Sequence, residues 1–244
     1  ILIINIMETI SSNRPKIVVI GSCNTDMVVK ANRLPVPGET ILGGTFYMNP
    51  GGKGANQAIA AARLGAEVTF ISKIGYDLFG LQALEIYRSE KINTEFIFTD
   101  QKSPSGVALI SVDSFGENSI IVAPGASRSL STEDINKAEE KIKEADIILM
   151  QLEVPIDTVE YAATIANRYG KKVILNPAPA STLSNSFLNN VHTILPNRIE
   201  AEMLSGIKVM DVESAHRAAK AIGEKGIELS LIHISEPTRP ISIS

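Results

Sequence analysis

The stretch "GGKGAN" at 51–56, glycine-rich with a single lysine, is the segment best suited to holding a ligand with many oxygen atoms. Glycines directly before a helix expose backbone N–H groups and let a ligand approach the backbone closely. Lys53 stands where the helix dipole is positive, which is unfavourable for a cation unless its ammonium group has another use. A flexible turn with a solvated lysine is the alternative. The stretch is not a P-loop, because Gly54 follows where Ser or Thr would hold magnesium, and it lacks the glycine spacing of dinucleotide folds.

Polar side chains also end two of the expected strands. Asn24 and Asp26 belong to "GSCNTD" (21–26), and Glu153 ends "MQLE". Open parallel sheets bind ligands beyond the carboxyl ends of their strands, and amide and carboxylate groups suit sugar hydroxyls. An Asx-turn at 24–26 and a solvated charge at 153 are the alternative interpretations.

The stretch "PNRIE" (196–200) places Asn197 and Glu200 three residues apart at the start of a helix. An N-cap Asn followed by Glu at the third helical position is typical of a capping box. The same oxygens could bind magnesium, or its water shell, near phosphates. Spacing alone leaves both interpretations open.

The remaining reactive residue types indicate structural roles. His192, His216 and His233 are scattered and lack metal-ligand spacing, and no nucleophile–base pair is evident. Cys23 is expected to pack rather than to catalyse. As the single cysteine it cannot form an intramolecular disulfide, so we expect a reducing, cytoplasmic compartment.

Composition excludes several classes of protein. The 244 residues are 44% hydrophobic and 20% charged, with a net charge of −4, as expected for a globular α/β protein but not for a nucleic-acid binder. No apolar run is long enough to span a membrane. Residues 1–6 are apolar but form a poor signal peptide. We interpret them as a non-native leader before a start at Met7, and a natural apolar extension is the alternative.

Expected strands and helices alternate, which predicts a doubly wound α/β fold with a mostly parallel sheet and helices on both faces. Two hairpins, within about 27–48 and 106–123, do not fit this alternation and predict a small antiparallel β lid. The expected strands of the main sheet lie at 16–22, 67–75, 146–153, 171–180 and 191–197. The expected helices lie at 51–66, 78–92, 131–145, 155–170, 198–206 and 213–226.

Taken together, these stretches resemble the ribokinase branch of the PfkB family of carbohydrate kinases. The resemblance covers about residues 15–228 and follows one order: "GSCNTD", "PGET", "GGKGANQA", "ARLGA", "GVALI", "MQLE", "NPAPA" and "PNRIEAE". Three of these motifs in one chain, "GGKGAN", "NPAPA" and "PNRIEAE", are quite specific.

The resemblance implies transfer of the γ-phosphoryl group of ATP to the 5-hydroxyl of D-ribose. It also implies a ribokinase-like fold, use of Mg²⁺ and of K⁺, and a homodimer formed through the lid. Another PfkB-type sugar or nucleoside kinase and a non-catalytic sugar-binding fragment are the alternatives. The implied phosphate residue is Asn197, and Glu200 would act on magnesium through water. The implied sugar-binding residues are Asn24, Asp26, Gly52, Lys53, Asn56 and Glu153.

The stretch "LSLIHISEPTRP" (229–240) continues none of these patterns. Residues 229–239 are identical to the translation of one end of a transposase-based sequencing adapter. We therefore interpret 7–228 as a partial ribokinase-like domain and 229–244 as an artefactual tail. The family's catalytic aspartate would lie beyond the truncation, so we expect the printed chain to be inactive and its parent to be active.

Overall fold

The computed structural model describes residues 14–227 and 229–230, and its centre is a seven-stranded sheet. The strand order is β11-β10-β9-β8-β1-β4-β5, and every neighbouring pair is parallel. This confirms the doubly wound prediction. The strands are β1 (Lys16–Ile20), β4 (Glu67–Gly75), β5 (Ile97–Asp100), β8 (Ile147–Met150), β9 (Lys172–Leu175), β10 (Thr193–Ile194) and β11 (Leu229–Ser230).

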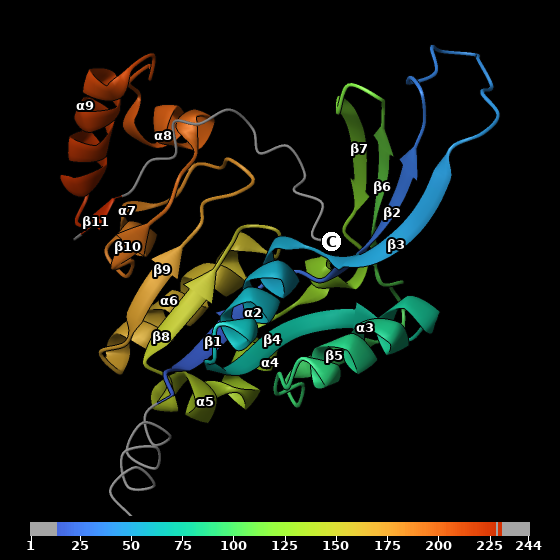
Figure 1. Cartoon of the computed structure of the whole chain (residues 1–244). Helices are drawn as coiled ribbons and strands as arrows, with labels where there is room; N and C mark the ends of the chain where they lie inside the picture. Colours follow the sequence, from blue (N-terminus) through green and yellow to red (C-terminus); the bar gives the residue numbers. More distant parts are fainter. Residues whose placement is uncertain (1–13, 228, 231–244) are drawn as a thin grey trace, which may run out of the picture.

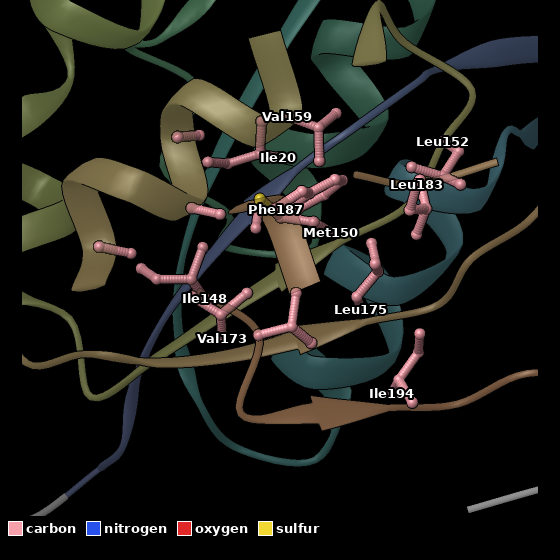
Figure 2. Packing of buried hydrophobic residues seen from close by; sticks show 14 of the residues in the cluster. Ile20, Ile148, Met150, Leu152, Val159, Val173, Leu175, Leu183, Phe187 and Ile194 are labelled. Atoms are coloured by element: carbon pink, nitrogen blue, oxygen red, sulfur yellow. The ribbon is translucent and has the colours of Figure 1, made fainter. Parts of the chain in front are cut away.

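Both faces of this sheet are covered, as the apolar sequence of β1 requires. Successive side chains of a strand point to opposite faces, so Val18 and Ile20 enter one core and Val19 enters the other. The larger core packs β1, β8 and β9 against α4 (Thr132–Lys137), α5 (Glu139–Glu144) and α6 (Ile156–Arg168). It also contains residues of helices further along the chain, among them Ala201 and Ala218. Figure 2 shows this core around Phe187 of α7 (Asn185–Leu188). The smaller core packs β1 and β4 against α2 (Lys53–Arg63) and α3 (Leu78–Ser89).

A second, four-stranded sheet projects from the main body as a lid (Figure 1). Its strands are β2 (Asn24–Lys30), β3 (Thr45–Gly51), β6 (Gly106–Val112) and β7 (Asn118–Ala123). The two predicted hairpins are present, but β2 pairs with β6 in parallel, so the lid is mixed rather than antiparallel. Both β2 and β6 begin at the main body and run outward (Figure 1), which makes their pairing parallel.

The remaining helical elements complete the chain. The helix expected at 131–145 is divided at Ala138 into α4 and α5, and the cap at Ser131 is a capping box with Asp134. A short 3-10 helix, η1 (Gly125–Ser129), follows the lid, and α8 (Arg198–Ser205) and α9 (Val212–Gly223) follow β10.

The two terminal predictions fall mainly outside the described residues. These include the whole of the expected leader at 1–6 and residues 231–244 of the expected tail. Leu229 and Ser230 form β11, paired in parallel with Thr193 and Ile194. The pairing uses backbone groups, which any residue except proline supplies in full. The origin of 229–244 stays a prediction.

Candidate functional site

Polar residues converge where β1 ends and the lid begins. The chain leaves β1 at Ile20 and enters β2 at Asn24, so Asn24 and Asp26 lie on the first lid strand rather than at the end of β1. Being two apart, they share one face of that strand. Asn24 is buried, and its Oδ1 has no hydrogen-bond partner among the described residues. Leaving such an acceptor unpaired typically costs about 1–3 kcal/mol, so a donor from a ligand would be stabilising here.

The glycine-rich stretch lies beside these residues because β3 pairs with β2. Asn24 is opposite Gly51, the last residue of β3, and Gly52 follows as the N-cap of α2. Gly52 has a φ of 90°, a left-handed conformation that favours glycine. A Cβ atom on Gly51 would lie 2.0 Å from Asp26 Oδ1, so the Asp26 carboxylate occupies the space that a side chain would need. The glycines at 51 and 52 therefore allow β2, β3 and the start of α2 to lie close together.

Glu153 closes the same site from the end of β8. Gly52 offers no side chain to cap α2, and the Glu153 carboxylate takes this role from another element. Its Oε2 accepts a hydrogen bond from Lys53 N at 2.9 Å and another from Ser22 Oγ. A carboxylate at a helix N-terminus is favoured by the helix dipole. Glu153 is thus held between α2 and the end of β1.

Asp26 and Glu153 form a like-charged pair. Burial, and secondly the nearby charge of Glu153, raise the pKa of Asp26 to about 6. Among the described residues no group donates a hydrogen bond to the Asp26 carboxylate, so its capacity to accept is not used. An ionised carboxylate accepts hydrogen bonds only, which suits the hydroxyls of a polyol.

Lys53 and Asn56 complete the predicted set from the first turn of α2. In the described part of the chain no carboxylate lies within ion-pair distance of Lys53 Nζ. Asn56 is exposed, and its backbone N–H donates to Gly52 O at 3.0 Å. Pairing and hydrogen bonds therefore bring Asn24, Asp26, Gly52, Lys53 and Glu153 together, and Asn56 is one helical turn away.

Three polar residues of this region were not predicted. Ser22 lies within "GSCNTD" and contacts Glu153, as described above. Gln151 is fully buried beyond the end of β8, and its Nε2 donates to Gln57 Oε1 on α2. For Gln151 the available signal was a polar residue directly after a strand, but neither its burial nor its partner could be known from sequence.

Asn197 and Glu200 lie apart from this group, at the start of α8. The sheet order puts β9 between β10, which precedes them, and β8. They form a capping box: Asn197 Oδ1 accepts from Glu200 N at 2.9 Å, and Glu200 Oε2 accepts from Asn197 N at 2.8 Å. Glu200 Oε1 accepts from Asn197 Nδ2 at 2.8 Å. Only 4% of Glu200 is exposed and both of its oxygens are used in the cap, so direct magnesium ligation would require breaking the cap.

Two further features are absent from the described residues. Within 14–227 and 229–230, no group of three or more His, Cys, Asp or Glu side chains is arranged to hold a metal ion. No helix in this part of the chain has the length and apolar character to cross a membrane.

Comparisons with known proteins agree on one family. The profile described as pfkB family carbohydrate kinase matches residues 14–237. A ribokinase of Haemophilus influenzae is 45% identical over 219 residues, covering 90% of this chain and 72% of that protein. A deoxyribokinase of Salmonella typhi is 37% identical over 221 residues, again 90% of this chain and 72% of that protein.

The fold comparison gives the same result. The structure of Arabidopsis thaliana ribokinase complexed with ribose and ATP matches with a TM-score of 0.80 and 30% sequence identity. The match covers 90% of this chain and 72% of that one. The similarity therefore extends over almost the whole described fold.

Proposed function

The chain belongs to the pfkB family of carbohydrate kinases, and we propose that its sugar is D-ribose, which ATP phosphorylates at the 5-hydroxyl to give ribose 5-phosphate. Sugar kinase chemistry follows from the family, and the choice of sugar is supported by the relatives. The Haemophilus influenzae relative is a ribokinase, and the Arabidopsis thaliana structure is described as complexed with ribose and ATP.

One observation supports a sugar at this site above all others: the unpaired Oδ1 of the buried Asn24. The Asp26 carboxylate, two residues along the same strand face, also accepts no hydrogen bond from the described residues. Acceptors gathered in this way suit a ligand with several hydroxyl donors, because an unmatched buried acceptor such as Asn24 Oδ1 is costly. Lys53 adds a donor, so the set suits a polyol that both donates and accepts.

The residues of the described chain position the sugar and exclude water. Asn24, Asp26 and Glu153 would orient its hydroxyls, with Gly52, Lys53 and Asn56 contributing from α2. The lid would cover the bound sugar, which limits loss of the phosphoryl group to water. Magnesium-bound ATP supplies the phosphoryl group. Asn197 towards phosphate, Glu200 towards magnesium through water, and K⁺ as a monovalent cation belong to the proposal.

A homodimer formed through the lid and a cytoplasmic location are parts of the same proposal. The lid exposes large apolar side chains, with 58% of Phe46, 53% of Leu109 and 68% of Ile121 accessible to solvent. Exposed apolar surface of this kind commonly marks a protein interface. Light scattering should give a dimer mass for the chain, and Ile121→Asp should shift it to the monomer; an unchanged mass for the variant would exclude this surface.

Deoxyribose is the second candidate substrate, favoured by the Salmonella typhi relative. Calorimetric titration of the chain with ribose, 2-deoxyribose and a hexose decides between them. We expect ribose to bind most tightly, and a preference for 2-deoxyribose would transfer the proposal to that sugar. Absence of binding by any pentose would contradict the proposed pocket.

A further inference from the structure

We propose that Ser22 is a positioning residue that fixes the Glu153 carboxylate so that one of its oxygens faces the sugar. This inference rests on the proposed function, which assigns Glu153 to the sugar pocket. Ser22 itself is not expected to touch the sugar.

Only one of the two carboxylate oxygens of Glu153 accepts hydrogen bonds from the described residues. Oε2 receives both protein donors, the N–H of Lys53 at 2.9 Å and the hydroxyl of Ser22. Oε1 receives no hydrogen bond from any residue that the structure describes. Each carboxylate oxygen can accept about two hydrogen bonds, so Oε2 is fully used and Oε1 is available.

The Ser22 hydroxyl restrains the Glu153 carboxylate in a way that Lys53 N alone cannot. A carboxylate held only by Lys53 N could still turn about that contact, because a glutamate side chain has several rotatable bonds. Ser22 approaches from the end of β1, a different element from α2. Two donors from two elements fix the rotation, which keeps Oε1 directed away from both.

Ser22 is well anchored for this role. It is 1% exposed, and its own carbonyl oxygen accepts from Ala55 N of α2 at 3.0 Å. One residue therefore aligns the first turn of α2 through its backbone and Glu153 through its hydroxyl. The first turn of α2 carries Lys53, so both parts of the pocket share this anchor.

The electrostatics agree with a carboxylate held in place. Burial, and secondly the charge of Glu153, raise the pKa of Asp26 to about 6, and the contribution of Glu153 depends on the distance between the two carboxylates. If Ser22 maintains this arrangement, removing its hydroxyl should let Glu153 move away and lower the pKa of Asp26. This effect needs no bound sugar.

The first test is the ribose affinity of the full chain. We expect Ser22→Ala to raise the Kd roughly 5–10-fold, because an indirect effect should be smaller than loss of a direct hydrogen bond to a charged group. The Kd of Ser22→Cys, whose thiol is a weaker donor, should fall between those of the wild type and Ser22→Ala. Ser72→Ala is the matched control: Ser72 is also buried, and its hydroxyl donates to Gly21 O at 2.7 Å but not to Glu153. Its Kd should stay near the wild-type value.

A double-mutant cycle tests whether Ser22 acts through Glu153. In a Glu153→Ala background, Ser22→Ala should change the Kd no further, since the group that it positions is absent. Independent, additive effects of the two substitutions would overturn the proposal, as would an unchanged Kd for Ser22→Ala alone.

A sugar-free measurement separates this inference from the proposed function. Carboxyl carbon NMR of the free chain, with the Asp26 signal assigned through Asp26→Asn, should show a lower pKa of Asp26 in Ser22→Ala and no change in Ser72→Ala. An unchanged pKa in Ser22→Ala would overturn the positioning role. If the wild-type chain fails to bind any pentose, the proposed function falls, and this titration still decides the role of Ser22.

Discussion

The pocket around Asp26 and the start of α8 differ in how they use their polar atoms. The first was predicted from polar residues at the ends of strands, and the second from the spacing of Asn197 and Glu200 at the start of a helix. Around Asp26, Asn24 Oδ1 is left without a partner in the described chain. At α8, Asn197 Oδ1 and both oxygens of Glu200 are used within one capping box. The unused acceptor at Asn24 supports the proposed sugar pocket, whereas the fully used oxygens at α8 support a structural cap.

The largest expected effect is the weaker ribose binding that follows loss of the Asp26 carboxylate. Asp26→Ala should weaken ribose binding by about 10–100-fold, the worth of a hydrogen bond to a charged group at 1.5–3 kcal/mol. Calorimetric titration measures this. Asp157→Ala, at an exposed position in the first turn of α6, is the control and should bind ribose normally. Equal affinities for Asp26→Ala and the wild type would remove Asp26 from the pocket.

The pH dependence of stability gives the next largest effect. The pKa of Asp26 is raised from 3.8 to about 6 in the folded chain. Between these values the folded state retains a proton that the unfolded state has released, so this group's contribution makes the chain less stable as the pH rises from about 4 to 6. This loss of stability is complete once the pH is above the folded-state pKa of Asp26.

Asp26→Asn should therefore raise the free energy of unfolding above pH 6, by on the order of 1 kcal/mol because the carboxyl is only partly buried. Urea unfolding at pH 4 and pH 7.5 tests this, and the gain should appear only at the higher pH. An equal rise in the free energy of unfolding at both pH values would show that the negative charge of Asp26 does not destabilise the folded chain.

The smallest effect concerns the cap of α8. Glu200→Gln keeps one acceptor for Asn197 N but places an amide beside Asn197 Nδ2 if its oxygen stays in the cap. We expect the free energy of unfolding to fall by about 1 kcal/mol, which lowers the Tm by about 2–4 °C, and the ribose affinity to stay unchanged. An unchanged Tm of the chain, together with an altered magnesium dependence of catalysis when the same substitution is made in the parent enzyme, would instead support the metal role.

The alternation of strands and helices predicted five of the seven strands of the main sheet, helped by buried apolar runs such as "KIVVI". The edge strands β5 and β11 were not predicted. The lid was predicted less completely. Its parallel pair joins Asn24 to Gly106, and pairing between distant segments is not encoded in local alternation. The boundary at Asn24 was also missed, since polar residues continue from the end of β1 into β2 without a change of pattern.

The sequence predicted which polar residues gather at the candidate site, but not the contacts between them. "GGKGAN" and Glu153 could be identified by type, yet the bond that joins Glu153 to Ser22 spans 131 residues. The capping box at Asn197 was one of two interpretations that spacing allowed, and only geometry shows that the cap uses both oxygens of Glu200. Local motifs therefore predict candidates, and tertiary contacts decide which atoms remain available.

The most direct test of the central claim is a crystal structure of the chain soaked with ribose. We expect ribose hydroxyls within hydrogen-bonding distance of Asn24 Oδ1, the Asp26 carboxylate and Glu153 Oε1, with Glu153 Oε2 still bound to Ser22 and Lys53. Ribose bound elsewhere, with Asn24 Oδ1 still unpaired, would contradict the account.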